Sequence, residues 1–287
     1  MASVAVVADS MSCLPRELVE QYNIGIVPLS LIIGGKVYRD WIDISPTEAY
    51  KLFLQDPETF ATSPASPGNF LEAYREASQR AKHVLCVTLS SRLSTGYDMA
   101  RVAQEDAKRE LPGISITVVD SQTVTAAEGF IALAAARAAA AGKTLAQVTK
   151  IAEEVREKVC FICVLDTIRH VYRTGRIPKI AAQAASVLNI KPILTSSDGL
   201  VRFAGATRNM KHGVERLFQI VKAKVGHNPV HVAVMHAFAP EEAEKIRKRV
   251  ATEYNCAELW VAEFSPVMGY ATGTGTLGMA FYKEETG

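Results

Sequence analysis

Serine, threonine and aspartate side chains collect where apolar runs of strand length end in the first half of the chain. They form three pairs: Asp9-Ser10, Ser90-Ser91 and Asp120-Ser121. The carboxyl ends of parallel strands meet at one edge of a sheet, and ligands of open α/β sheets bind at that edge. The spacing therefore predicts a polar ligand site there.

Two further hydroxyl pairs stand near the predicted starts of helices, Thr62-Ser63 in ATSPAS and Ser94-Thr95 in SSRLSTGY. Hydroxyls and backbone N–H groups at a helix N-terminus attract anions, because both donate hydrogen bonds and the helix dipole favours negative charge. Helix capping is the simpler explanation for any one of these residues. Their concentration near the strand ends of one sheet favours an anion site.

Other chemistries have weaker support. The first strand leads into ADSMSCLP without the glycines of a dinucleotide fingerprint, and the chain has no G-x-S-x-G elbow. The histidines lack metal-ligand spacing, so His231 and His236 are expected to be structural. Asp9 and Asp120 could form a carboxylate pair, but capping of neighbouring loops is the simpler role. The glycine-rich stretch 269–278 is expected to be a tight turn or crossing between two strands.

The C-x-x-C of Cys160 and Cys163 lies within CFICVL, which has the pattern of a buried strand. Redox pairs favour a helix N-terminus, which lowers the thiol pKa, and two strand residues three apart face opposite sides. We therefore expect buried, apolar cysteines and a reducing cytoplasm.

Length and composition indicate an ordinary globular protein with two domains. The chain has 287 residues, of which 48% are hydrophobic and 22% charged, and its net charge is +2. This charge argues against nucleic acid and against stable binding to an anionic membrane, although it is compatible with a transient membrane contact. The N-terminus resembles a first strand rather than a signal peptide, and no apolar run approaches the roughly 18 residues of a membrane span.

Strand-like and helix-like patterns alternate along the chain, which is typical of α/β layers with mostly parallel strands. The predicted strands are 4–10, 24–35, 83–91, 115–121, 160–165, 231–237, 258–264 and 277–282. The predicted helices are 66–81, 93–110, 124–141, 144–158, 178–188, 208–225 and 240–254. We expect two α/β domains, 1–158 and 159–287, with a mostly parallel sheet in the first.

These landmarks, in this order, resemble the DegV family across essentially the whole chain. VVADSMSCLP is similar to the opening D-S-x-x-x-L-P of the family, Thr62-Ser63-Pro64 to its T-S-x-P-S loop, and SSRLSTGYDMA to its S-S-x-L-S-G-T-Y turn. The segments IVPLSLIIGGKVYRDW, VVDS, TGRIP, LNIKPIL and DGLV also occur in the family's order.

The resemblance implies a carrier that holds one long-chain fatty acid at the cleft between its domains, without catalysis, metal or other cofactor. The carboxylate would be bound by Thr62 and Ser94, with Ser63 and Ser91 as secondary candidates. Family members known as acyl-binding subunits present this carboxylate to a separate kinase, which makes an acyl phosphate for phospholipid synthesis. The arginines associated with that partner match Arg176 and Arg208.

Two departures from the family pattern affect the expected head-group site. Thr95 and Gly96 are exchanged relative to the family turn, so Thr95 brings a hydroxyl where glycine is usual. Ala271 replaces the histidine of the family's G-x-H-T-G-P-G segment, and Thr274 replaces its proline. Our hypothesis is that Tyr270 or Thr272 supplies the missing donor, or that the head group is held more loosely.

Several alternatives stay open at this point. An enzyme could use Ser94 or Ser91 as nucleophile on an acyl or phosphoryl substrate, and a lipid-sensing regulator would need no kinase. The apolar residues of 124–141 and 180–193 could line the tail tunnel or, equally well, pack closely between helix and sheet. The sequence leaves the preferred chain length, the existence of a kinase partner and the oligomeric state undecided.

Overall fold

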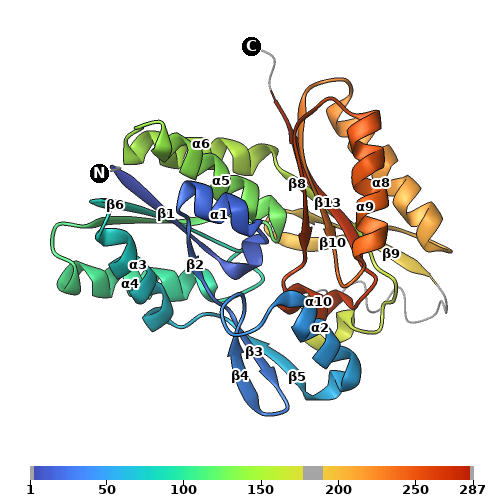
Figure 1. The fold of residues 1–287 in the computed structure, drawn as a ribbon, viewed down its shortest axis with the longest axis horizontal. Coiled ribbons are helices and arrows are strands. Elements are labelled where there is room, and N and C mark those ends of the chain that lie inside the picture. The colour runs from blue at the N-terminus through green and yellow to red at the C-terminus, as the bar shows by residue number, and fades with distance from the viewer. Residues whose placement is uncertain (1–2, 177–189, 285–287) are drawn as a thin grey trace.

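A parallel four-stranded sheet forms the centre of the N-terminal half (Figure 1). The computed structural model describes residues 3–176 and 190–284. The strand order is β2-β1-β6-β7, with bounds Gly25–Val27 for β2, Val4–Asp9 for β1, His83–Thr88 for β6 and Ser115–Asp120 for β7. Helices cover both faces, which explains why β1 and β6 are apolar almost throughout.

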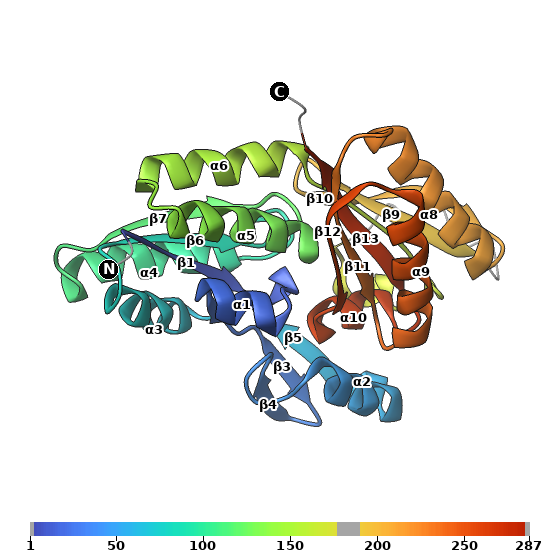
Figure 2. The ribbon, with the colours of Figure 1, turned by 45° about the horizontal axis from the view of Figure 1, so that its top comes forward.

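One face of this sheet packs on α3 (Pro67–Ser78) and α4 (Gly96–Glu110), and the other on α5 (Ala126–Ala140). The next helix, α6 (Leu145–Lys158), runs alongside α5 (Figure 2). The 3-10 turn η1 (Ser10–Ser12) and α1 (Arg16–Tyr22) follow β1. Helix α5 is buried between this sheet and the C-terminal one, so its alanines allow close approach on both sides.

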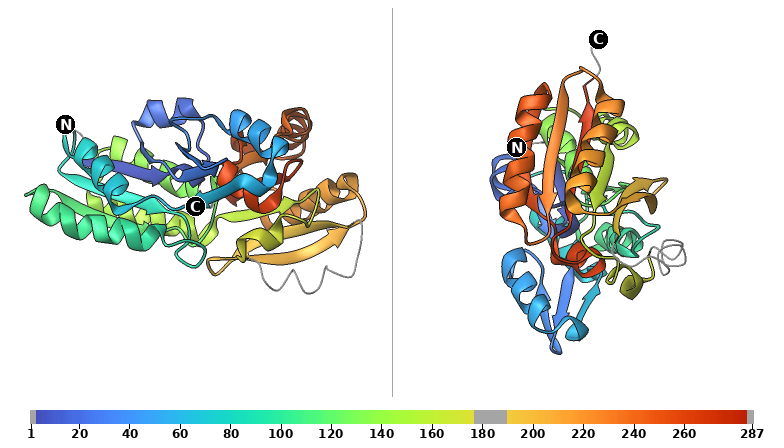
Figure 3. Two further views of the ribbon diagram at one scale, coloured as in Figure 1. Left: turned by 90° about the horizontal axis from the view of Figure 1, so that it is seen from below. Right: turned by 90° about the vertical axis from the view of Figure 1, so that its right-hand side faces the viewer.

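The C-terminal half contains a six-stranded mixed sheet in the order β10-β9-β8-β13-β11-β12. Its strands are β8 (Cys160–Val164), β9 (Lys191–Ser197), β10 (Leu200–Thr207), β11 (Val230–His236), β12 (Cys256–Glu263) and β13 (Leu277–Lys283). Among these pairs, only β11 and β12 are parallel. Helices α8 (Met210–Val225) and α9 (Pro240–Glu253) cover the outer face, seen from that side in Figure 3.

A small antiparallel sheet projects from the N-terminal half in the order β4-β3-β5. It contains β3 (Ser30–Ile33), β4 (Lys36–Arg39) and β5 (Phe60–Ser63), and it packs with α2 (Pro46–Gln55), which the 3-10 turn η2 (Pro57–Thr59) follows. The prediction of one strand over 24–35 is therefore wrong. Pro28 lacks a backbone N–H, and the run changes sheets at this point.

The other predicted strands and most predicted helices are confirmed, with shifts at their ends. The prediction for 178–188 lies outside the described residues. The glycine-rich stretch 269–278 is not simply a turn, because its first residues belong to α10 (Pro266–Thr272). A 3-10 turn, η3 (Val171–Thr174), follows β8. The predicted domain boundary falls between α6 and β8 and stays a prediction.

The two cysteines of the C-x-x-C lie in a strand as expected, but only Cys163 is buried, whereas Cys160 is partly exposed. Cys160 and Cys163 both lie in β8 and are both free thiols. Cys163 faces the core around α5, whereas Cys160 contacts the core under α8 and α9. None of the helices in the described part of the chain is long and apolar enough to cross a membrane.

A buried carboxyl pair, Asp9 and Glu128, lies between β1 and α5. Glu128 is fully buried, and no donor within the described ranges reaches either of its carboxylate oxygens. Burial, and then the charge of Asp9, raise the pKa of Glu128 well above its usual value. Glu128 therefore stays neutral to higher pH than an exposed glutamate, and burial also raises the pKa of Asp9, to about 6.

Glu128→Gln is expected to make the protein less sensitive to alkaline pH. Above the pKa of an exposed glutamate, native Glu128 keeps a proton that the unfolded chain has lost. The free energy of unfolding therefore falls as pH rises, by about 1.4 kcal/mol per pH unit, until native Glu128 ionises. Urea unfolding at several pH values should show a flatter profile for Glu128→Gln. The exposed control Glu153→Gln should keep the parental slope, and equal slopes in all three proteins would contradict a neutral Glu128.

Candidate functional site

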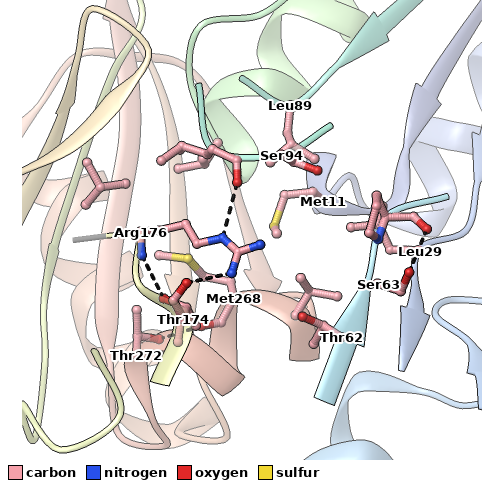
Figure 4. Close-up of a pocket in the computed structure, with 16 residues that line it drawn as sticks. Met11, Leu29, Thr62, Ser63, Leu89, Ser94, Thr174, Arg176, Met268 and Thr272 are labelled. Atoms are coloured by element: carbon pink, nitrogen blue, oxygen red, sulfur yellow. Dashed lines mark hydrogen bonds between the residues drawn. The ribbon is translucent and has the colours of Figure 1, made fainter. Parts of the chain in front are cut away.

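A pocket lies among the two main sheets, the small antiparallel sheet and α10 (Figure 4). Most of its lining is apolar and comes from segments far apart in the chain: Met11, Leu29, Leu89, Leu93, Val124, Val201, Val267 and Met268. Such a lining can remove a hydrocarbon ligand from water. The two methionines add adaptable walls, because their side chains are unbranched and flexible.

Four of the predicted hydroxyl residues line this pocket: Thr62 and Ser63 from β5, Ser94 from the loop before α4, and Thr272 from α10. Ser94 Oγ accepts a hydrogen bond from the Gly96 N–H at 3.2 Å, so its own hydroxyl proton stays available. The Ser63 hydroxyl contacts the carbonyl oxygen of Pro64 at 3.4 Å. The Thr62 hydroxyl has no hydrogen-bond partner among the described residues, so Thr62 and Ser94 are the better donors to a ligand.

Arg176, which follows η3, extends its side chain into the same pocket between Ser94 and Thr62 (Figure 4). Its guanidinium group donates to the backbone oxygens of Leu93 at 3.4 Å and Thr174 at 2.5 Å. Within the described part of the chain it pairs with no carboxylate. Arg176 is exposed to solvent where it lines this apolar pocket, and its guanidinium group can form charge-assisted hydrogen bonds there with a ligand that carries a negative charge.

Ser91 and Thr95 lie outside the pocket lining. The Ser91 hydroxyl donates to Asp120 Oδ2 at 2.5 Å, and the same carboxylate accepts from the Ser91 N–H. Thr95 is exposed at the start of α4 and makes no capping hydrogen bond with its side chain. The carboxylates of Asp9 and Asp120 accept hydrogen bonds from backbone N–H groups of neighbouring loops, which is the capping role expected from the sequence.

The residues expected to replace the family histidine have other partners. Tyr270 stacks on Phe60, with 5.7 Å between ring centroids, and does not line the pocket. Thr272 lines it, but its hydroxyl donates to the Met268 carbonyl oxygen at 3.0 Å. Ala271 also lines the pocket, so Arg176 is the better placed donor on this side.

Arg208, the second predicted partner contact, is exposed just after β10 and forms no ion pair with another described residue. Of the predicted tunnel walls, Val124 lines the pocket, whereas α5 packs closely between the sheets. Residues 180–189 lie outside the described residues. In the described ranges, no group of histidine, cysteine, aspartate and glutamate side chains could hold a metal ion.

Several lining residues were not predicted, including Met11, Leu29, Val201 and Met268. Their spacing along the chain does not distinguish them as pocket residues, because each belongs to a different segment and has the apolar side chain of an ordinary core residue. Among the described lining residues there is no histidine, aspartate or glutamate. Ser94 therefore has no general base beside it in this part of the pocket, which weakens the nucleophile hypothesis.

Comparison with known proteins decides the family. The model of the family described as "Uncharacterised protein, DegV family" matches residues 3–284. The chain belongs to the DegV family. A DegV domain-containing protein of Clostridium perfringens is 31% identical over 284 residues, which cover 98% of this chain and 99% of that protein.

Solved structures of DegV-family proteins have the same α/β fold. One from Thermus thermophilus, described by its fatty acid binding, is 31% identical, with a TM-score of 0.89 over 98% of this chain and 100% of that one. DegV of Bacillus subtilis, described as a fatty acid binding protein, is 27% identical, with a TM-score of 0.89 over 99% and 100% of the two chains. Fatty acids are thus ligands of relatives that share this fold.

Proposed function

We propose that this DegV-family protein is a non-catalytic carrier that binds one long-chain fatty acid and presents the carboxylate to a partner kinase. The observation that carries the proposal is the pairing of an apolar pocket with Arg176, whose charge is not neutralised by any described carboxylate. Ser94 and Thr62 would donate the remaining hydrogen bonds to the head group. The fatty acid binding of relatives with the same fold supports this ligand class.

The tail and the head group of the fatty acid contribute differently to the free energy of binding. Burial of each methylene contributes about 0.8 kcal/mol, so roughly fifteen of them supply about 12 kcal/mol before association costs. A hydrogen bond to a charged group contributes only about 1.5–3 kcal/mol. The tail therefore supplies most of the affinity, whereas Arg176, Ser94 and Thr62 select an acid over a neutral lipid.

The ligand class is tested by extracting the purified protein with organic solvent and identifying the released lipids by mass spectrometry. We expect a long-chain fatty acid in near-stoichiometric amount, and uptake of added free acid in preference to its methyl ester. A protein that carries no fatty acid and binds none on addition would refute the proposal. Equal affinity for acid and ester would refute the carboxylate site alone.

Ser94→Ala is expected to impair presentation to the kinase more than binding, because the tail retains most of the affinity while the carboxylate loses an orienting donor. The measurement pairs fatty acid affinity with the rate of acyl phosphate formation by a fatty acid kinase. Ser91→Ala is the matched control, since Ser91 bonds to Asp120 away from the pocket. Parental phosphorylation of the fatty acid held by Ser94→Ala would contradict the role given to Ser94.

A further inference from the structure

Asp40, the residue after β4, is buried with 2% of its surface exposed and joins segments far apart in the chain. Its Oδ2 atom accepts hydrogen bonds from the hydroxyls of Ser10 and Ser265, both at 2.7 Å. Its backbone N–H donates to the carbonyl oxygen of Leu29 at 2.8 Å. One residue next to the small antiparallel sheet thus contacts η1, the segment before β3, and the start of α10.

Each of these contacts leads directly to a wall of the pocket. Leu29 lines the pocket itself, and its N–H donates to Ser10 Oγ at 3.2 Å. Ser10 is followed by Met11, another lining residue. Ser265 caps α10 by accepting a hydrogen bond from the N–H of Val267, which also lines the pocket, at 3.2 Å. These hydrogen bonds link three segments of the pocket wall to one carboxylate residue.

We propose that Asp40 is a positioning residue: its ionised carboxylate holds η1 and α10 at the separation that binds the fatty acid tail, and its protonation loosens them and promotes release. The proposal rests on the proposed function, because it assigns regulation to the same pocket. Asp40 does not line that pocket and acts through Ser10, Leu29 and Ser265.

The charge of Asp40 is suited to such a role. Hydrogen bonds to an ionised acceptor are roughly twice as strong as neutral ones, so protonation weakens both hydroxyl contacts. Burial raises the pKa of Asp40 to about 6, and the hydrogen bonds from Ser265 and Ser10 oppose this rise. The titratable and charged groups that face Asp40 or share its adjoining cavity are Asp9, Cys13, Arg16, Glu17, Tyr50 and Glu263.

The test measures binding of a fluorescent long-chain acid, cis-parinaric acid, to the parent protein and to Asp40→Asn from about pH 8 to about pH 5, across the pKa of a buried carboxyl. Asparagine keeps the size of aspartate but has one acceptor oxygen and no charge. We expect about tenfold weaker binding by Asp40→Asn at the alkaline end, the equivalent of one charge-assisted hydrogen bond. The parent should lose affinity as the pH falls through about 6, relative to Asp40→Asn.

Asp43→Asn is the matched control, because Asp43 lies in the same loop but is exposed and pairs with Arg39 at 2.9 Å. It should retain both the affinity and the pH profile of the parent. Ser10→Ala keeps the Asp40 charge but removes one of its donors, together with the acceptor of the Leu29 N–H, so it should show a loss in the same direction even if Asp40→Asn does not fold.

Two results would overturn the proposal in distinguishable ways. If the parent binds the acid, and Asp40→Asn or Ser10→Ala binds it with the parental affinity and pH profile, Asp40 does not position the walls. If the parent binds no fatty acid at any pH, the proposed function fails, and the role of Asp40 fails with it.

Discussion

Gly269→Ala is expected to destabilise the protein by about 3 kcal/mol, the upper part of the usual range for an overpacked core. A methyl group on Gly269 would overlap the ring of Tyr50, which is fully buried in α2. The ring has little freedom to move, because its hydroxyl donates to the Phe264 carbonyl oxygen at 3.0 Å. Helix α10 would have to shift, and with it the pocket wall formed by Met268 and its neighbours. Urea unfolding of the variant and the parent measures the loss.

A glycine with free space supplies the control for this prediction. At Gly68, in the first turn of α3, an added methyl would meet only the Ser66 hydroxyl at 3.6 Å, so Gly68→Ala should be neutral or slightly stabilising. In a Tyr50→Leu background the cost of Gly269→Ala should fall, giving a coupling energy between the two sites. An equal cost in both backgrounds would show that α10 is not held against Tyr50.

Arg176→Gln is expected to weaken binding of a free fatty acid by ten- to a hundredfold, the effect of removing a charge-assisted interaction of about 1.5–3 kcal/mol. Binding of the corresponding methyl ester should change little, because the apolar lining is unaltered. Calorimetric titration with both ligands measures the difference. If acid and ester lost affinity equally, Arg176 would be a packing residue rather than the counter-charge.

Arg208→Gln is the matched control for this measurement. Arg208 is exposed and does not line the pocket, so its loss should leave the affinity for the free acid unchanged. Because Arg208 is, like Arg176, a predicted partner contact, the same variant also separates a carrier from a sensor. A carrier should lose transfer to a kinase while it retains lipid.

The local hydrophobic pattern predicted strands and helices well wherever the burial of an element is uniform along its length. Strands β1 and β6 are continuous apolar runs covered on both faces, and α3 presents Phe70 and Tyr74 on a single stripe. The run 24–35 was predicted wrongly because composition does not reveal that Pro28 separates two sheets. Helix α10 was not predicted, because its sequence contains glycine. Gly269 is required by a tertiary contact, since the ring of Tyr50 from α2 packs where a side chain would lie.

The sequence by itself predicted that Thr62 and Ser94 could hold an anion, because both belong to hydroxyl pairs near the predicted starts of helices, and this assignment stays a prediction. Only the tertiary structure decided which candidates meet. Ser91 bonds to Asp120 and Tyr270 stacks on Phe60, while Arg176 extends into the pocket. The physical reason is that hydrogen bonds and ring contacts between distant segments choose the direction of each side chain. The spacing of residues along the chain does not predict those contacts.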